Sequence, residues 1–277
     1  MHARSSSFPS ITLNPLSLCR WVNMERWRLD NKIALVTGGS KGIGKAIVDE
    51  FLQLGATVVT VARNADTLAE SIRPWTEQKK PVVAVPADVA TEEGRRRVLE
   101  TVKMRFGMLD VLVSNVGTNI RKPIGDYSVE EVEFLIRTNL VSSLEIVRAA
   151  FPLLQPSGNG SVIFIGSIAG LNTVRTGIPY GATKAALGQV TRGLAVEWAK
   201  HAIRVNLIAP GFIKTPLTEY LQGNEQLMSY VNSRIPMQRL GVPQEIAALA
   251  AFLAMPASSY VTGQVLIADG GVTANLI

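Results

Sequence analysis

The stretch Ile33-Ala-Leu-Val-Thr-Gly-Gly-Ser-Lys-Gly-Ile-Gly44 decides the fold of this chain of 277 residues. Its apolar first part predicts a buried strand, and the amphipathic residues after Gly44 predict a helix. Gly38, Gly42 and Gly44 stand at the junction, where they permit a tight turn. The first turn of the helix would offer unpaired N–H groups and a positive dipole end to phosphates. We therefore expect a dinucleotide pyrophosphate here, with Ser40, Lys41 and Ile43 in the same binding turn.

Apolar runs and helical patterns alternate through the rest of the chain. The runs are short and rich in β-branched residues, which is typical of strands buried on both faces of a parallel sheet. We therefore predict an α/β fold of the Rossmann type: a doubly wound, seven-stranded parallel sheet with helices on both faces. The strands are expected at 33–36, 57–61, 82–85, 111–113, 162–165, 205–208 and 264–267, and the helices at 42–54, 64–79, 92–106, 128–154, 178–201 and 243–254.

We expect one domain at residues 28–277, after an N-terminal extension at 1–27. Ser128 and Glu131 form a capping-box pattern at the start of the longest predicted helix. The segment 211–236 interrupts the alternation of strands and helices. It follows the carboxyl end of a strand, where ligands bind in such sheets, so it is either a mobile lid or a surface insertion.

Composition excludes several classes of protein. One cysteine and two histidines rule out a disulfide scaffold and make a metal site improbable, so we expect no metal. No apolar run is long enough to span a bilayer, and we expect no membrane partner. The net charge is +6, but the lysines and arginines are spread along the chain, so we expect no nucleic-acid partner.

Residues 1–24 differ in composition from the rest. They contain five serines, two arginines and no acidic residue, as organelle transit peptides do. The alternative is an untranslated or disordered extension, with Met24 as the true start. We expect a cytoplasmic protein, unless residues 1–24 are a real transit peptide.

The end of the second predicted strand indicates which dinucleotide binds. Many NAD-binding units place an acidic residue there, on the ribose 2′-hydroxyl. Here Arg63 and Asn64 stand in its place, and Lys41 adds a second cation. Two cations without an acid suit a 2′-phosphate, so the sequence favours NADP(H). The alternative is an ordinary surface arginine.

Three further polar positions follow predicted strands. Asp88, beside Val89, could accept a hydrogen bond from the adenine amine or from a backbone donor. Asn115 mainly braces neighbouring strands in our interpretation, with Gly117 two residues later. Asn139 lies within a predicted helix among leucines and isoleucines, which favours a buried polar role.

Tyr180 and Lys184 share one helical face, and Ser167 stands at the end of a strand. A lysine ammonium near a tyrosine would lower the tyrosine pKa toward the range useful for acid–base catalysis. Ser167 could donate a hydrogen bond to a substrate oxygen. The spacing alone also fits an ordinary helix face, because Tyr-x-x-x-Lys is common by chance.

Through these residues, the chain resembles the short-chain dehydrogenases/reductases over about residues 28–277. The resemblance rests on the order and spacing of Gly38, Gly42, Gly44, Asn115, Asn139, Ser167, Tyr180, Lys184 and Pro210-Gly211. Within that family the chain is most similar to tropinone-reductase-like enzymes, through Tyr180-Gly-Ala-Thr-Lys184, Leu194-Ala-Val-Glu-Trp-Ala-Lys200 and Asp269-Gly-Gly-Val-Thr-Ala-Asn275. It also resembles 3-oxoacyl-carrier-protein reductases, notably in Pro210-Gly-Phe-Ile-Lys-Thr215. One departure is Ser114-Asn-Val-Gly117, where the family usually has Asn-Asn-Ala-Gly.

The resemblance implies an NADPH-dependent reduction of a ketone to an alcohol, with Tyr180 as the proton donor. Lys184 would lower the tyrosine pKa and bind the nicotinamide ribose, and Ser167 would polarise the carbonyl. Asn139 would hold a water in a proton relay. Ile213 and Thr215 would meet the nicotinamide carboxamide, and Pro210 and Gly211 would also bind the cofactor. The chain would form a homotetramer or homodimer.

Two alternatives remain open at this stage. The substrate could be a 3-oxoacyl group on a carrier protein, or the protein could be a nucleotide sensor without catalysis. The substrate pocket is expected to be mostly apolar, which identifies no molecule. Its expected side chains are Leu171, Val174, Ile178, Phe212, Leu217 and Leu221.

Overall fold

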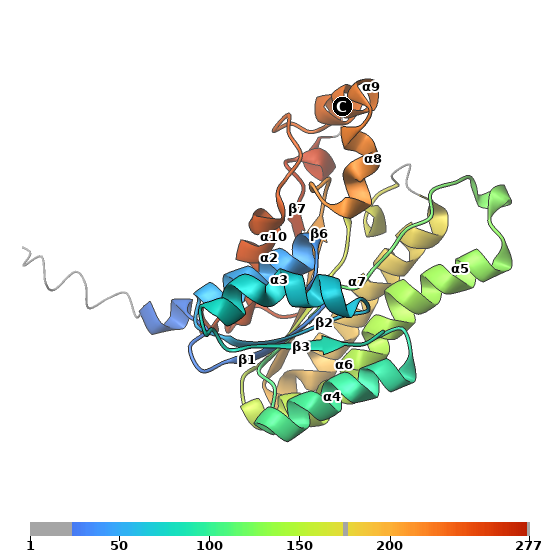
Figure 1. The fold of residues 1–277 in the computed structure, drawn as a ribbon. Helices are drawn as coiled ribbons and strands as arrows, with labels where there is room; N and C mark the ends of the chain where they lie inside the picture. The colour runs from blue at the N-terminus through green and yellow to red at the C-terminus, as the bar shows by residue number, and fades with distance from the viewer. Residues whose placement is uncertain (1–23, 174–176, 276–277) are drawn as a thin grey trace, which may run out of the picture.

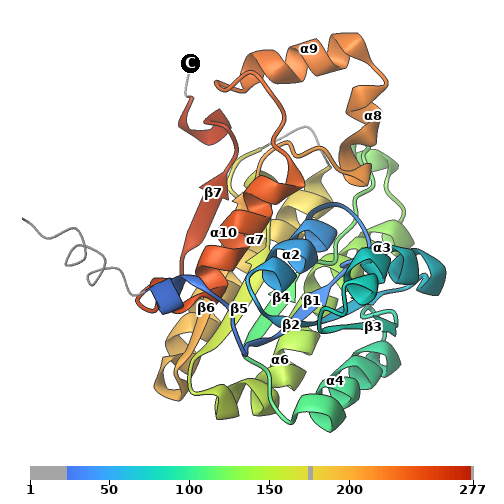
Figure 2. The same cartoon turned by 60° about the vertical axis from the view of Figure 1, so that its left-hand side comes forward.

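The structure is a computed structural model of the chain and describes residues 24–173 and 177–275. Seven parallel strands form one sheet in the order β3-β2-β1-β4-β5-β6-β7, so the predicted fold is confirmed (Figures 1 and 2). The order runs outward in two directions from β1 and β4, which makes the sheet doubly wound and leaves a crevice at the reversal. The strands are β1 (Ile33–Thr37), β2 (Thr57–Ala62), β3 (Val82–Pro86), β4 (Val111–Ser114), β5 (Gly160–Ile165), β6 (Ile203–Pro210) and β7 (Val265–Ala268).

Helices cover both faces of the sheet. α2 (Gly42–Gln53), α3 (Ala65–Glu77) and α10 (Pro243–Ala254) lie on one face. α4 (Glu92–Phe106), α6 (Ser142–Leu154) and α7 (Ile178–Trp198) lie on the other, with α5 (Val129–Ile136) beside α7. Each layer has its own apolar core, and Phe51 and Phe164 are among the largest fully buried side chains. Burial of such a side chain stabilises the fold by about 1.5–3 kcal/mol.

The helix predicted at 128–154 is not continuous. α5 begins with the predicted capping box, because Ser128 Oγ accepts from Glu131 N and Ser128 N donates to Glu131 Oε2. A five-residue π-helical turn, Arg137–Val141, then separates α5 from α6. The Ser142 N–H bonds to the Arg137 carbonyl five residues back, and Asn139 lies inside this wider turn. Such turns are frequent at functional sites.

The segment 211–236 is helical rather than irregular. It contains the short turn η8 (Pro216–Thr218) and the helices α8 (Glu219–Gln222) and α9 (Glu225–Arg234). These helices stand above the body of the molecule and have an apolar cluster of their own, formed by Leu221, Val231, Ile235 and Leu240 (Figures 1 and 2).

The described part of the chain starts with the turn η2 (Met24–Trp27), which packs on the domain. The Trp27 ring stacks on Phe252 of α10 with 6.1 Å between centroids, and Arg26 Nη2 donates to the Ala257 carbonyl. The last four residues of the expected extension therefore contact the body, and residues 1–23 lie outside the described part. Among the described residues, no helix is long and apolar enough to cross a membrane.

Candidate active site

A cleft of about 650 Å³ lies along the carboxyl ends of the strands. It brings together most of the residues that the sequence indicated, from the glycine turn to the end of β6. Gly44 and Asn139 are buried and do not line it. The predicted residues at its wall are Gly38, Ser40, Lys41, Ile43, Arg63, Asn64, Asp88, Val89, Asn115, Gly117, Ser167, Tyr180, Lys184, Pro210, Gly211, Ile213 and Thr215.

The glycine turn has the shape that a pyrophosphate needs. Gly38 and Gly42 have φ of 70° and 55°, in the left-handed region that side chains disfavour. A Cβ on Gly44 would lie 2.2 Å from the Gly38 carbonyl oxygen, so the chain can pass itself closely only with glycine there. Lys41 is the N-cap of α2 and gives no side-chain cap to the helix. The first N–H groups of α2 are thus available to an anion.

Two cations lie beside this turn at the end of β2. Lys41 and Arg63 are exposed, and neither has an ion-pair partner in the described part of the chain. Asn64 is less available to a phosphate, because its Oδ1 accepts from Thr67 N at 2.7 Å and caps α3. Arg63 is therefore the more available group for a phosphate in the cleft.

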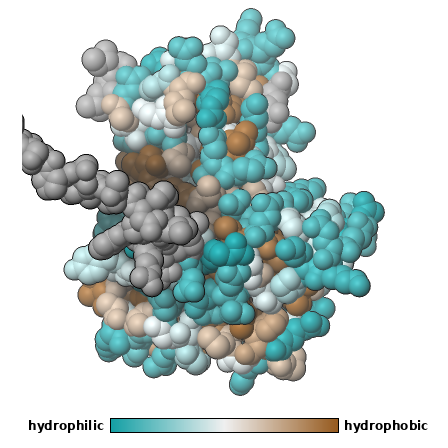
Figure 3. All heavy atoms as spheres, turned by 90° about the vertical axis from the view of Figure 1, so that its left-hand side faces the viewer, coloured by the Kyte–Doolittle hydropathy of each residue, from teal (hydrophilic) through white to brown (hydrophobic). Residues whose placement is uncertain are grey.

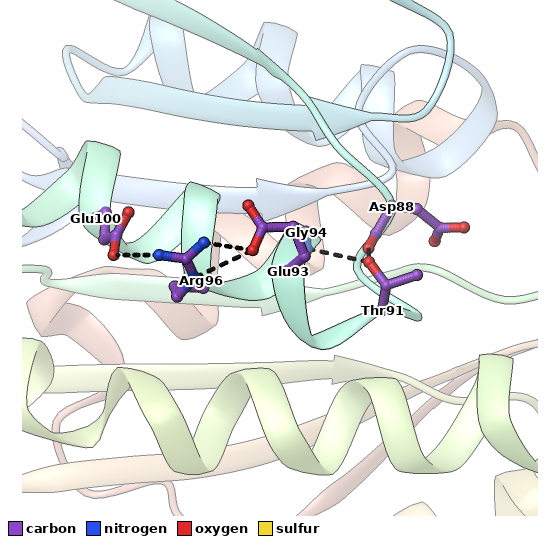
Figure 4. A network of polar contacts seen from close by, with 6 residues as sticks. All are labelled: Asp88, Thr91, Glu93, Gly94, Arg96 and Glu100. Carbon is purple, nitrogen blue, oxygen red and sulfur yellow. Dashed lines mark hydrogen bonds and ion pairs between the residues drawn. The ribbon is translucent and has the colours of Figure 1, made fainter.

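The start of α4 holds Asp88 in place (Figure 4). Its carbonyl oxygen accepts from Thr91 N and Thr91 Oγ1, and its Oδ1 accepts from Ala90 N at 2.9 Å. Figure 4 shows the carboxylate pointing away from Thr91. A Cβ on Gly94 would lie 1.9 Å from the Asp88 carbonyl oxygen, so the helix can approach this closely only at a glycine.

Asn115 braces the two strands at the crevice, as its position indicated. Its Nδ2 donates to the carbonyls of Thr37 and Gly38, and its N–H donates to Thr37 Oγ1. The end of β4 is thereby fastened to the glycine turn. Val116, the residue that departs from the family pattern, packs against the core on the α4–α6–α7 side.

Ser167, Tyr180 and Lys184 meet where β5 ends against α7. Tyr180 and Lys184 lie one turn apart on the buried face of α7. The Ser167 hydroxyl acts on the Tyr180 hydroxyl, because it lowers the Tyr180 pKa against the effect of burial. Ser167 Oγ accepts from Ala169 N, so its hydroxyl proton can be donated either to Tyr180 or to a substrate oxygen. A Cβ on Gly170 would lie 2.6 Å from the Lys184 carbonyl carbon, so a glycine lets this turn rest against α7.

Burial controls the titration of both catalytic candidates. It raises the pKa of Tyr180, whereas the Ser167 hydrogen bond and the positive charge of Arg121 act in the opposite direction. Lys184 is not among the groups that shift the Tyr180 pKa here, so the expected lowering of that pKa by the lysine stays a prediction. Burial lowers the pKa of Lys184 to about 8, while its Nζ donates to the Ile165 carbonyl at 2.9 Å.

Asn139 is fully buried behind the cleft and fixes the loop after β4. Its Oδ1 accepts from Thr118 N at 2.8 Å, and its Nδ2 donates to the Thr118 carbonyl at 2.9 Å. The Nδ2 also reaches Thr183 Oγ1, which lies beside Lys184 on α7. This buried asparagine thus connects the π-helical turn, the loop and α7.

Several expected and unexpected residues shape the rest of the site. Leu217 lines the cleft as expected, whereas Leu171 and Ile178 line a second cavity beside it. Phe212 and Leu221 line neither cavity and pack in the α8–α9 cluster, so their place at the substrate stays a prediction. Val174 lies outside the described residues. The sequence interpretation missed Thr67, Phe134, Thr138 and Thr218 at the cleft wall, although Thr67 and Thr138 are close in sequence to residues that it named.

Known proteins are similar to this chain over nearly its whole length. A family model described as enoyl-(acyl carrier protein) reductase matches residues 38–273. A tropinone reductase homolog of Arabidopsis thaliana is 47% identical over 252 residues, 91% of this chain and 96% of the relative. The chain belongs to the short-chain dehydrogenase/reductase family.

Solved structures of the family agree with the fold. The complex of Pseudomonas aeruginosa RhlG with NADP has a TM-score of 0.85 and 37% identity, over 90% of this chain and 98% of that one. A gluconate 5-dehydrogenase of Burkholderia cenocepacia in complex with NADP and tartrate has a TM-score of 0.87 and 31% identity, over 91% and 99%. This short-chain dehydrogenase/reductase is therefore an oxidoreductase of the tropinone-reductase-like kind, acting on CH–OH or C=O groups.

Proposed function

We propose that this enzyme uses NADPH to reduce a ketone to an alcohol, with Tyr180 as the general acid. The observation that carries the proposal is the meeting of Ser167, Tyr180 and Lys184 in the same cleft as the glycine turn and Arg63. The cleft could hold a dinucleotide and a small carbonyl compound together, as hydride transfer requires.

The residues of the cleft fit NADP(H). The uncapped start of α2 would bind the pyrophosphate, and Arg63 with Lys41 would bind the 2′-phosphate. Two similar solved structures are NADP complexes, which supports this choice. When bound, the cofactor supplies the hydride that reaches the carbonyl carbon. Asp88 would meet the adenine, and Ile213 and Thr215 would lie at the nicotinamide.

Each catalytic candidate has a role that its surroundings support. Tyr180, with its pKa raised by burial, remains protonated at neutral pH and can give its proton to the carbonyl oxygen. Ser167 would donate a hydrogen bond to the same oxygen as negative charge develops on it. Lys184, largely protonated below pH 8, would bind the nicotinamide ribose and act as a source of the proton that Tyr180 gives up. Asn139 would complete the relay by holding a water.

Replacing Tyr180 by Phe tests this proposal. Turnover should fall by about a hundredfold or more, because the proton donor is removed. NADPH binding, measured by the fluorescence of the bound cofactor, should change little. A Tyr180→Phe enzyme with wild-type turnover of any ketone would refute the assigned role.

A second substrate class has specific support in the family description. The matching model is described as enoyl-(acyl carrier protein) reductase, which supports a substrate carried by an acyl carrier protein, although it names an enoyl group and not a 3-oxoacyl group. The enzyme could accordingly reduce a 3-oxoacyl thioester on a carrier protein. Turnover of an acetoacetyl carrier protein at least tenfold faster than that of a free ketone panel would favour this class.

We propose that the chain forms a homotetramer, or a homodimer, through helices that carry exposed apolar side chains. Apolar side chains are exposed on the α5–α6 side, at Val129, Ile136 and Val141, and on α7, at Val196. β7 ends the sheet with a half-exposed Ile267, and the side of the molecule in Figure 3 also carries hydrophobic surface. Light scattering should give four times the mass of one chain, and a monomer would contradict the proposal. Val196→Glu should dissociate the assembly, whereas Met104→Glu on α4 should not.

We propose a cytoplasmic location, with plastid import as the alternative. A relative named as a chloroplastic tropinone reductase homolog of Arabidopsis thaliana is 42% identical over 99% of this chain. Fluorescent fusions of the full chain and of a chain starting at Met24 should both spread through the cytoplasm of plant cells. Plastid accumulation of the full chain alone would favour the transit peptide.

A further inference from the structure

The loop 118–123, between β4 and α5, is held at three of its residues. Asn139 binds both main-chain groups of Thr118, and the Tyr127 hydroxyl donates to the Ile120 carbonyl. Lys122 forms an ion pair with Glu131 at 2.5 Å. The backbone that carries Arg121 is therefore in a fixed position beside the cleft.

Arg121 reaches from this loop to the helices above the site. Its Nη2 donates to the Leu217 carbonyl at 3.0 Å, and its Cζ lies 4.2 Å from the centroid of the Tyr220 ring on α8. Stacking on an aromatic ring holds a guanidinium in place without neutralising it. Contacts to two different elements restrict where this charge can go.

The charge of Arg121 is uncompensated and close to the catalytic tyrosine. No carboxylate pairs with it in the described part of the chain. Its positive charge opposes the burial-driven rise of the Tyr180 pKa, so it lies within electrostatic reach of the reacting hydroxyl. One N–H group is used on Leu217, which leaves others for a ligand.

A second cavity, of about 790 Å³, flanks the Ser167–Tyr180 pair. Residues that follow Ser167 and residues on both sides of Tyr180 form part of its wall. Arg121 and Lys122 are the charged side chains among the described residues that line it, and none of these lining residues is acidic. Since Glu131 pairs with Lys122, the net charge that the described residues present to this cavity comes from Arg121.

We propose that Arg121 selects the substrate by charge, so that ketones carrying a carboxylate are favoured and ketones carrying an ammonium group are disfavoured. The inference rests on the proposed ketone reduction and names its substrate class. With its carbonyl at Ser167 and Tyr180, a substrate would extend its other end toward the second cavity. There a carboxylate would gain a charge-assisted hydrogen bond, and a cation would meet an unpaired like charge.

A series of ring ketones that differ chiefly in charge tests this selection. The neutral member is 4-tert-butylcyclohexanone, the cation is 4-(trimethylammonio)cyclohexanone and the anion is 4-oxocyclohexanecarboxylate. The ratio of kcat/KM for the anion to that for the cation should fall about tenfold in Arg121→Met, because each exposed charge contact contributes roughly three- to fivefold and the two contacts act in opposite senses. Arg121→Glu should lower this ratio further.

The adjacent lysine provides the matched control. Lys122→Met removes a cation that Glu131 already compensates, so it should leave the ratio within about twofold of the wild type. If Arg121→Met slows all three ketones equally, Arg121 only fastens α8 and the proposal is overturned. An unchanged ratio overturns it as well.

A binding measurement separates this proposal from the reaction itself. Calorimetry of cyclohexanecarboxylate with the enzyme–NADP⁺ complex should show binding that weakens about three- to fivefold in Arg121→Met and stays unchanged in Lys122→Met. If no ketone is reduced, the proposed function fails, while the same titration still decides the role of Arg121. Equal affinity of wild type and Arg121→Met, or no binding to the wild type, would overturn charge selection.

Discussion

Gly117 and Lys184 approach so closely that any side chain at position 117 would crowd the lysine ammonium group. A Cβ on Gly117 would lie 3.2 Å from Lys184 Nζ and 3.4 Å from Asn139 Oδ1. Lys184 cannot easily retreat, because it is buried and donates to the Ile165 carbonyl. A methyl group at position 117 would therefore push against an ammonium group that is already held by the Ile165 carbonyl.

Gly117→Ala should impair catalysis more than folding. The added methyl group would displace the lysine Nζ by a few tenths of an ångström or more, and misplaced catalytic groups cost on the order of tenfold to a hundredfold in turnover. Steady-state kinetics of the folded variant measures the effect. Gly125→Ala is the control, since a Cβ there meets nothing within 4 Å. Wild-type turnover in Gly117→Ala would contradict the close fit.

Lys184→Met should stabilise the folded protein and abolish its activity. The lysine carries its charge at pH 7 although it is buried, with a pKa lowered to about 8. The unfolded chain binds this proton more tightly, so wild-type stability rises as pH goes from about 8 to 10.5. At pH 7 the variant should gain about 1–2 kcal/mol in the free energy of unfolding, after the loss of one hydrogen bond.

Urea unfolding at several pH values measures this difference. The advantage of Lys184→Met over wild type should shrink as pH rises above 8, because the wild-type lysine then becomes neutral in the folded state. Lys103→Met, at an exposed site in the last turn of α4, should change stability by about 0.5 kcal/mol or less at each pH. A pH-independent difference would show that the buried charge is not the cause.

Local patterns in the sequence were enough for the fold but not for all of the site. Strands and helices were predictable because buried runs and caps, such as Ser128 with Glu131, act over a few residues. The π-helical turn was not, since it accompanies a bond from Asn139 to Thr118, 21 residues away. Likewise, spacing placed Tyr180 beside Lys184, but the direction of the Tyr180 pKa follows from burial by distant elements.

Arg63→Ala should reduce the preference for NADPH over NADH. Loss of a charge-assisted hydrogen bond to the 2′-phosphate should weaken NADPH on the order of tenfold and leave NADH nearly unchanged. Fluorescence titration with both cofactors measures the two dissociation constants. Arg73→Ala, at an exposed position on α3, should alter neither. Equal weakening of both cofactors would refute the phosphate-binding role.

Asn139→Ala should destabilise the protein and slow its turnover together. The substitution leaves the N–H and carbonyl of Thr118 without their partners, which should cost about 2–4 kcal/mol in the free energy of unfolding. The freed loop carries Gly117 and Arg121, so we expect turnover to fall at least tenfold. Ser142→Ala is the matched control, because among the described residues this buried hydroxyl bonds to the Thr138 carbonyl, four residues back, and to no other group. Denaturant unfolding and kinetics on both variants test the role, and Ser142→Ala should lose about 1 kcal/mol while keeping its turnover. If Asn139→Ala lost stability but retained full turnover, the bond to Thr118 would serve the fold alone.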